Sequence, residues 1–502
     1  MRNKLVYLFI AFLLILILPY VVSYFLTGDG YQFGGFLLNP IDGHSYLAKM
    51  QLGRSGEWLF RLPYTSKPGD GVFLFTYYIV LGHIAGLLHL PSIIIFHTAR
   101  IINSIFLFFV LTRFIRLYFS DSWSLFTIGL LSFGSGLGWV VLLFGYVNSD
   151  FTIPEIYPFL SCLTNPHFPL AIGLMLIILA RTRELKFRNT ILTMLISILL
   201  LIIQPFCMVI VIGILSLSIL LALKEKLIVK LIQLSALATP SIIFGLYLTM
   251  ILKNNPALSS WNSQNLTPSP PIWDLILALS PIILPAVYGI ISIIKSKEKT
   301  YYPLVIWMFF VVFLAYIPLN LQRRFLIGIY IPVTILGIKG LMIFGERFKE
   351  KYGKLKNIFF AAAIPSNIIL IALSILAVAQ NNPKLVMKET LWSGIQWISM
   401  NTPAGSLVLT SPTIALYIPA YTNDRVVYGH PYETAEAQRN LVNVVEFFSK
   451  MSPEEQLKYQ IDEGIDYILT ASEISAGPMN YSPINANVVY QIDDVKIYLV
   501  KK

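Results

Sequence analysis

Long apolar runs separated by short polar gaps occupy the chain from residue 5 to residue 380. The runs lie at about 5–26, 92–114, 123–146, 166–180, 190–204, 206–223, 230–252, 273–294, 301–319, 325–345 and 357–380. An apolar helix of about 20 residues is long enough to cross a bilayer. The pattern therefore predicts a polytopic α-helical membrane protein with about eleven transmembrane helices.

Two features decide how the apolar runs are divided. Gln204-Pro205 interrupts the stretch 190–223, and because proline removes a backbone donor, we expect two short spans there. The run 72–90 is also apolar, but it is short and contains Gly82, His83 and Gly86. We interpret it as a helix that lies at the membrane surface.

Basic residues indicate the orientation. If 72–90 does not span, one set of alternate gaps holds Arg2, Lys4, Arg113, Arg116, Arg181, Arg183, Lys186, Arg188, Lys224, Lys226, Lys230, Lys295, Lys297, Lys299, Arg347, Lys349, Lys351, Lys354 and Lys356. The opposite short gaps hold only Lys253, Arg323 and Arg324. Since cytoplasmic loops are rich in lysine and arginine, we expect a cytoplasmic N-terminus and an extracytoplasmic loop at 27–91.

The polarity of the chain changes at about residue 385. Charged residues are interspersed from there on, and the pattern predicts helices at 389–399, 433–450 and 453–463 with strands at 406–410, 425–428, 467–470 and 495–500. We therefore expect a transmembrane domain at 1–380 and a small extracytoplasmic α/β domain at 385–502.

Composition agrees with the membrane assignment. Hydrophobic residues make up 56% of the chain and charged residues 13%, and the mean hydropathy is +0.70. The net charge of +11 does not indicate a nucleic-acid partner, because the basic residues lie in the gaps between apolar runs. The two cysteines, Cys162 and Cys207, indicate neither a disulfide framework nor a zinc site. The N-terminal run is longer than a signal-peptide core and lacks a cleavage site, so we expect a retained first span.

The first external loop carries a candidate catalytic group. Asp42, Tyr46 and Lys49 follow one another at helical spacing and share one face if the segment is a helix. A carboxylate at the outer membrane surface can act as a general base or bind a divalent metal ion. The structural alternative is that Asp42 caps the N-terminus of a surface helix.

The same loop resembles membrane glycosyltransferases of the GT-C class, which include protein O-mannosyltransferases and lipid A aminoarabinose transferases. The resemblance rests on Asp42, Tyr46, Ala48-Lys49 and Gly56-Glu57-Trp58, and on the layout of run 72–90 followed by a span with Arg100 near its outer start. A second acid often follows the first in that class. Gly43 stands there in this chain, which departs from the metal-binding variant.

The resemblance implies a cell-envelope enzyme that transfers a sugar from a polyprenyl phosphate to a glycan, lipid or protein acceptor, with Asp42 as the base. It also implies that an arginine near the outer end of a late span binds the lipid phosphate. Arg323 and Arg324 are the candidates, and guanidinium groups suit phosphate geometry. Ordinary contact with lipid headgroups is the alternative.

Other polar residues are candidates for acceptor or sugar binding. Asp150 and Glu155 lie in the second external loop, where carboxylates are ordinarily solvated. The segment 428–434 is polar, aromatic and rich in Gly and Pro, a composition that suits sugar contacts or a structural turn. The remaining candidates are His44, Tyr46, His167, His430 and Glu433.

Two other functional classes fit a polytopic chain of this kind. A lipid or polysaccharide transporter or flippase would carry polar groups at mid-membrane depth and often shows repeated halves. Few charges lie inside the predicted spans, Arg100 and Lys339 being the clearest, and no repeat is visible. A non-catalytic envelope protein with the GT-C architecture is the third class. The large outer loop favours the enzyme.

Overall fold

A computed structural model describes residues 2–183, 187–221, 227–347, 352–472, 479, 481 and 483–501. Five basic residues used to predict the orientation, Lys186, Lys224, Lys226, Lys349 and Lys351, lie outside the described residues. The chain forms two compact units. The helical unit comprises Met1–Pro19, Thr98–Leu246 and Leu266–Ser374, and the mixed unit comprises Tyr20–His97, Tyr247–Asn265 and Ile375–Lys502.

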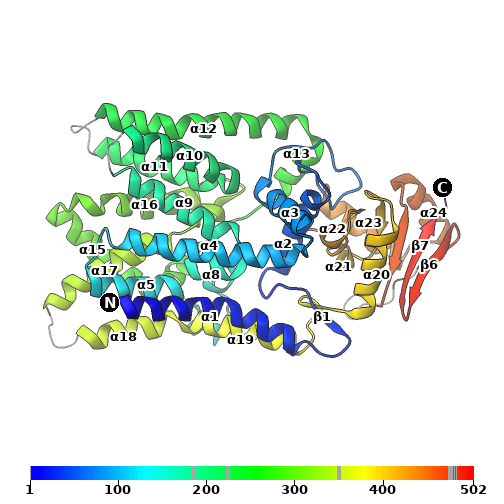
Figure 1. The fold of residues 1–502 in the computed structure, drawn as a ribbon, viewed down its shortest axis with the longest axis horizontal. Helices are drawn as coiled ribbons and strands as arrows, with labels where there is room; N and C mark the ends of the chain where they lie inside the picture. Colours follow the sequence, from blue (N-terminus) through cyan, green and yellow to red (C-terminus); the bar gives the residue numbers. More distant parts are fainter. Residues whose placement is uncertain are drawn as a thin grey trace. The chain divides into compact units, whose positions relative to one another are not determined.

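The boundary between the units falls inside four helices, which are α1 (Arg2–Leu26), α4 (Ser92–Ile115), α12 (Leu227–Asn254) and α19 (Pro365–Ala379) (Figure 1). The other helices of the helical unit are α5 (Asp121–Phe133), α6 (Gly138–Leu142), α7 (Ser149–Thr152), α8 (Pro158–Thr164), α9 (His167–Arg181), α10 (Phe187–Ile203), α11 (Pro205–Leu221), α14 (Ile272–Ala278), α15 (Ile283–Ser296), α16 (Tyr302–Tyr316), α17 (Tyr330–Arg347) and α18 (Tyr352–Ala363). Three 3-10 turns, η1 (Pro154–Ile156), η2 (Lys299–Tyr301) and η3 (Gln322–Leu326), connect them.

Within the described residues, six helical stretches are long and apolar enough to cross a membrane. They are Asn3–Leu26, Ser92–Ile115, Ser122–Leu142, Leu227–Asn254, Lys299–Tyr316 and Lys354–Ala379. Shorter apolar helices accompany them at Thr76–Leu88, His167–Arg181, Asn189–Ile203, Pro205–Leu221 and Tyr330–Gly345. The chain therefore has the apolar helices that the hydropathy pattern predicts.

Two details of the apolar runs can be compared with the sequence. The break at Pro205 is confirmed, since α10 ends at Ile203 and α11 begins at Pro205. The run 273–294 forms two helices, because α14 ends at Ala278 and α15 begins at Ile283 at an angle of 92° to it. Pro281 and Pro285 lie in and just after the break, where each lacks the backbone N–H that a continuing helix needs.

The mixed unit contains a five-stranded sheet with the order β4-β3-β5-β7-β6. The strands are β3 (Leu407–Leu409), β4 (Arg425–Val426), β5 (Tyr467–Thr470), β6 (Ala486–Ile492) and β7 (Val495–Val500). β3 pairs in parallel with β4 and β5, whereas β7 is antiparallel to β5 and β6. The helices around it are α20 (Glu389–Asn401), α21 (Pro412–Ala415), α22 (Ile418–Tyr421), α23 (Ala437–Ser449) and α24 (Pro453–Glu463). A second sheet pairs β1 (Tyr31–Phe33) with β2 (Val386–Lys388).

Three more helices of the mixed unit are α2 (Pro40–Arg54), α3 (Thr76–Leu88) and α13 (Pro256–Gln264). Glycines allow α2 and α3 to pack backbone to backbone. A Cβ atom on Gly82 would overlap the carbonyl oxygen of Met50, and one on Gly53 would overlap that of Ile79. This close contact fixes α2, the helix that carries Asp42.

Candidate active site

Asp42 lies in the first turn of α2, which begins at Pro40. The alternative that Asp42 is the N-cap is therefore wrong, since Asn39 holds that position, with a φ of 48° and no side-chain capping bond. About half of the Asp42 side chain is exposed (51%). The unpaired N–H groups of a helix start favour a negative charge, so Asp42 is placed where an accessible carboxylate is stabilised.

The predicted helical face is confirmed, because α2 runs through Asp42, Tyr46 and Lys49. The ring of Tyr46 stacks on that of Tyr78 with centroids 4.3 Å apart. Lys49 is fully buried, and its ammonium lies 4.4 Å from the centroid of Phe75. The same face of α2 thus carries an accessible carboxylate at Asp42 and a buried cation at Lys49.

A buried ion pair joins α2 to the segment before α23. Lys49 Nζ lies 2.6 Å from Glu433 Oε1, and the Ser45 hydroxyl donates to the same carboxylate oxygen at 2.7 Å. Lys49 also donates to Ser45 Oγ at 2.6 Å. Burial raises the pKa of Glu433, but the charge of Lys49 and the hydrogen bonds from Lys49 and Ser45 outweigh this and hold it below its usual range. Glu433 is therefore the anionic partner of a buried lysine.

The His430 ring is held in one orientation by the backbone. Its Nδ1 accepts hydrogen bonds from the backbone N–H groups of Tyr432 and Glu433, each at 3.1 Å. A neutral imidazole with an accepting Nδ1 carries its proton on Nε2. Burial lowers the pKa of His430, which favours this neutral form.

His430 Nε2 faces the Asp42 carboxylate at 3.9 Å from Oδ1 and has no hydrogen-bond partner among the described residues. That separation is longer than a direct hydrogen bond but short enough for electrostatic interaction. His430 therefore presents a buried N–H toward an exposed carboxylate. The Asp42 carboxylate can therefore act as a general base, with His430 favouring one orientation of the carboxylate and the exposed part of Asp42 accessible to a substrate.

The residues around Asp42 do not fit a metal centre. No group of three or more His, Cys, Asp or Glu side chains with metal-binding geometry occurs in the part of the chain that the structure describes. The position where a second acid would follow Asp42 is occupied by Gly43, and a Cβ there would lie 2.5 Å from the Phe36 ring.

His44, another sequence candidate, is a buried residue of α2. Its Nδ1 lies 2.7 Å from the carbonyl oxygen of Pro40, to which it donates, and its ring packs edge-on against Tyr417. Burial lowers the pKa of His44 to about 4, so the ring is neutral at physiological pH. Its contacts are those of a packing residue in the α2 segment.

Asp150 and Glu155 belong to the helical unit, and both are buried there. The expectation that these loop carboxylates are solvated is therefore wrong. Asp150 Oδ2 accepts hydrogen bonds from Ser366 Oγ at 2.7 Å and from the Gly138 N–H at 3.0 Å. Burial raises the pKa of Asp150 to about 6, although these hydrogen bonds oppose the shift. Glu155 accepts a backbone bond from Gly328 at its carbonyl oxygen.

Arg323 and Arg324 lie in η3, also in the helical unit, and are half-buried. The Nε atoms of both are buried and have no hydrogen-bond partner among the described residues. The hydroxyls of Thr267 and Ser269, on the segment that pairs with Arg323, are also buried without a hydrogen-bond partner among the described residues. The backbone N–H of Arg323 donates to the carbonyl oxygen of Thr267, so η3 lies beside the segment that contains Thr267 and Ser269. Unpartnered donors of this kind suit an anion.

His167 begins α9, and its ring lies 4.1 Å from that of Phe168. Asp274, which is not among the sequence candidates, is buried in the helical unit. Asp274 accepts bonds from the Ser149 hydroxyl and N–H and from the Tyr146 hydroxyl. The available signal was its position as a lone acid inside an otherwise apolar run. Ser45, the third member of the Lys49–Glu433 cluster, was also missed and has no distinguishing sequence signal.

No protein-family profile matches this sequence, and no curated protein matches it. Solved structures do. The oligosaccharyltransferase AglB from Archaeoglobus fulgidus, in complex with an inhibitory peptide and a dolichol-phosphate, has a TM-score of 0.52 at 12% identity, covering 91% of this chain and 69% of AglB.

ArnT from Cupriavidus metallidurans is similar over nearly all of both chains. In the apo state its TM-score is 0.50 at 11% identity, and bound to undecaprenyl phosphate it is 0.51 at 10% identity, with 97% of each chain covered in both cases. At such low identity the likeness concerns the fold. The chain therefore has the fold of the GT-C membrane glycosyltransferases, as the first external loop predicts.

Proposed function

We propose that this protein is a membrane glycosyltransferase that transfers a sugar from a polyprenyl phosphate to an acceptor at the outer face of the cell membrane. The observation that carries the proposal is the fold, which is shared with structures that hold dolichol-phosphate or undecaprenyl phosphate. The half-exposed carboxylate of Asp42, flanked by the buried His430 N–H, supplies the chemistry that such an enzyme needs.

In the proposed reaction an acceptor O–H or N–H group attacks the anomeric carbon of the donor sugar. The new bond to the anomeric carbon forms as the bond to the phosphate oxygen breaks, and polyprenyl phosphate leaves with the bonding electrons. Asp42 accepts the proton that the acceptor loses. His430 acts as a positioning residue, because its Nε2–H faces Asp42 Oδ1 and favours one orientation of the carboxylate.

Arg323 and Arg324 are the proposed ligands of the donor phosphate. Their unpartnered Nε atoms and the neighbouring hydroxyls of Thr267 and Ser269 support this role, since a phosphate accepts several hydrogen bonds at once. The Arg324 guanidinium also lies 5.8 Å from the centroid of Phe206, which helps to hold it in place. Acceptor or sugar binding by Tyr46, Asp150, Glu155 and His167 stays a prediction.

The proposal includes an orientation. Residues 1–380 cross the membrane in about eleven spans with a cytoplasmic N-terminus, and 27–91 and 385–502 lie outside. The six long apolar stretches, the bent pair α14–α15 and the short helices α9, α10, α11 and α17 support this number, with α3 at the surface. Short spans of this kind pair with neighbours in the protein interior.

The decisive experiment compares wild-type protein with Asp42→Asn in purified form, using a labelled polyprenyl-phosphate sugar and membrane-derived acceptors. We expect turnover by the wild type and a loss of about a hundredfold or more in Asp42→Asn. Asp70→Asn is the matched control, because it removes an exposed carboxylate from the same loop, and it should retain full activity.

Each outcome bears on a different part of the proposal. Full activity in Asp42→Asn would overturn the assignment of the base. Lipid movement across liposomes without any sugar transfer would replace the enzyme with a flippase. A wild-type protein that neither transfers sugar nor moves lipid would point to a non-catalytic envelope protein.

A further inference from the structure

The segment 427–436, between β4 and α23, contains no helix or strand. It carries His430, which faces Asp42. It also carries Glu433, which pairs with Lys49. A segment without regular structure needs hydrogen bonds from elsewhere to pair its backbone groups. The side chains that bond to this backbone therefore determine where His430 lies.

The Gln264 side chain, at the end of α13, supplies three such hydrogen bonds. Its Nε2 donates to the carbonyl oxygen of Tyr432 at 3.0 Å and to that of Thr434. Its Oε1 accepts the backbone N–H of Ala437, the first residue of α23, at 3.2 Å. Glu436 holds the N-cap position of α23 with a φ of 50° and makes no side-chain capping bond. Gln264 therefore caps α23 from a different helix.

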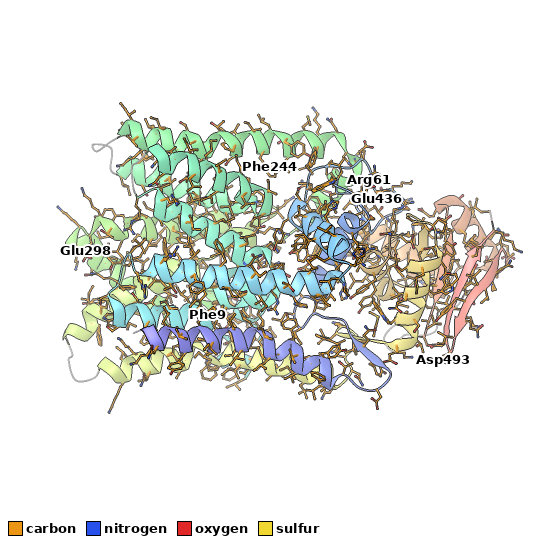
Figure 2. The ribbon with its side chains drawn as sticks, viewed as in Figure 1. Phe9, Arg61, Phe244, Glu298, Glu436 and Asp493 are labelled. Carbon is orange, nitrogen blue, oxygen red and sulfur yellow. The ribbon has the colours of Figure 1, made fainter. Side chains whose placement is uncertain are left out.

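A second side chain of α13 adds to this contact. The Ser260 hydroxyl accepts the backbone N–H of Glu436, which is labelled in Figure 2, at 3.1 Å. Ser260 and Gln264 are four residues apart, so they share one face of α13. Four backbone groups between Tyr432 and Ala437 are thus bonded to one helical face.

α13 also contacts the first external loop. Asn255, its N-cap residue, donates through Nδ2 to the carbonyl oxygen of Asp70 at 3.0 Å. The Trp261 ring lies edge-on to that of Phe75, with centroids 6.0 Å apart, and Phe75 in turn lies over the Lys49 ammonium. α13 and α3 share a hydrophobic cluster and lie side by side (Figure 1). α13 therefore contacts both parts of the chain that form the candidate active site.

A continuous chain of contacts links Gln264 to Asp42. The Tyr432 carbonyl that accepts from Gln264 belongs to the same peptide unit as the Glu433 N–H. That N–H donates to His430 Nδ1 at 3.1 Å, and His430 Nε2 faces Asp42 Oδ1 at 3.9 Å. Because a peptide unit is planar, a hydrogen bond at its carbonyl restricts the direction of its N–H. Gln264 thus fixes the peptide unit that orients the His430 ring.

We propose that Gln264 is a positioning residue for sugar transfer, which acts on the candidate base through the Tyr432–Glu433 peptide and the His430 ring. Gln264 touches no reacting atom in this role. α13 is the scaffold that holds the segment 427–436 against the loop that carries Asp42. The inference rests on the proposed function, because the orientation of Asp42 matters for a proton that the acceptor loses.

Steady-state kinetics of the full-length protein in detergent test this role. We expect Gln264→Ala to lower kcat about tenfold with little change in KM. If Gln264 acts through His430, the double variant Gln264→Ala/His430→Asn should lose no more than His430→Asn alone. Ser263→Ala is the matched control, because the Ser263 hydroxyl donates within α13, to the Ser260 carbonyl oxygen, and this variant should retain the wild-type rate.

A variant of equal length separates positioning from helix capping. Gln264→Glu keeps an acceptor for the Ala437 N–H, but its carboxylate cannot donate to the carbonyl oxygens of Tyr432 and Thr434. We expect it to lose as much kcat as Gln264→Ala. A wild-type kcat in Gln264→Glu would overturn the proposal. Losses that multiply in the double variant with His430→Asn would also overturn it, since the two residues would then act independently.

Hydrogen exchange measured by mass spectrometry tests the contact without sugar transfer. We expect the backbone N–H groups of 430–437 to exchange about fivefold faster in Gln264→Ala and at the wild-type rate in Ser263→Ala. Unchanged exchange in Gln264→Ala would overturn the positioning role. A wild-type protein without transferase activity would instead refute the proposed function, and faster exchange in Gln264→Ala would still support the contact.

Discussion

His430 illustrates how one side chain can serve structure and chemistry through different atoms. Nδ1 accepts the backbone N–H groups of Tyr432 and Glu433, whereas Nε2 faces Asp42. Asparagine can place an acceptor oxygen near the position of Nδ1 but has no group at the position of Nε2. We therefore expect His430→Asn to retain the thermal midpoint of the wild type and to lose about tenfold in kcat with little change in KM.

The control for this prediction is His430→Gln, whose amide N–H can reach toward Asp42. It should recover part of the rate at some cost in thermal midpoint, because the backbone groups lose their acceptor. A His430→Asn protein with wild-type kcat would show that the imidazole N–H does not position Asp42. The thermal midpoint and the steady-state rates are measured on the same purified preparations.

Removing one member of the Lys49–Glu433 pair should destabilise the protein more than removing both. Removing one member leaves the other charged and buried, so we expect Lys49→Met to lower the free energy of unfolding by about 3–5 kcal/mol. The double variant Lys49→Met/Glu433→Leu should lose less than Lys49→Met alone. Thermal unfolding in detergent measures both.

The exposed pair Arg439–Glu436 provides the comparison for that ion pair. Its atoms are 2.9 Å apart, but both side chains are mostly exposed, so Arg439→Met should cost less than about 1 kcal/mol. Equal losses in Lys49→Met and Arg439→Met would contradict a stabilising role for the buried pair.

Only part of the site could be predicted from the sequence. Asp42, Tyr46 and Lys49 share a helical face by spacing alone, and α2 confirms it. The partner of Lys49 could not be predicted, because Glu433 is 384 residues away and no local periodicity encodes the contact. The burial of Asp150 was likewise hidden, since it depends on the hydroxyl of Ser366 from a distant helix.

At the scale of secondary structure, the position of Asp42 depends on the close packing of α2 against α3. We expect Gly82→Ala to lower the free energy of unfolding by about 2 kcal/mol or more, because its Cβ would overlap the Met50 carbonyl oxygen, a backbone atom that cannot turn aside. Activity should fall with it, as α2 is displaced. Differential scanning fluorimetry and the sugar-transfer assay measure the two effects.

Gly245→Ala is the matched control for this substitution. It lies inside α12, and among the described residues no atom outside that helix's own nearby backbone lies within 4 Å of the added Cβ, so the change should be neutral or stabilise slightly through helix propensity. A Gly82→Ala protein as stable as Gly245→Ala would show that α2 and α3 are not held at the close separation seen here.

Secondary structure was predictable where side chains alternate between buried and exposed or fill a buried strand. β5 and β7 have the bounds that the sequence indicates, and α20 begins at the expected Glu389. β6 escaped prediction because most of its side chains are exposed and its pairing with β7 is its main support. β1 and β2 are three residues each and pair across the chain, which no local pattern reveals.

At the scale of the full chain, the side of the membrane on which each polar segment between two spans lies is predicted from hydropathy and the basic residues together. Cys162 and Cys207 are both fully buried, so the natural protein should react little with a maleimide. Single cysteines at exposed lysines can therefore report the side directly. Lys4, Lys295 and Lys458 are exposed and lie at the N-terminus, at the end of α15 and in α24.

We expect a membrane-impermeant maleimide to label Lys458→Cys on intact cells and to label Lys4→Cys and Lys295→Cys only after lysis. Lys458 tests the outer position of 385–502, whereas the other two must agree with each other. If 72–90 crossed the membrane as an additional span, Lys4 and Lys295 would face opposite sides, because one more crossing would separate them. Labelling of Lys4→Cys but not Lys295→Cys on intact cells would therefore move α3 from the membrane surface into the bilayer.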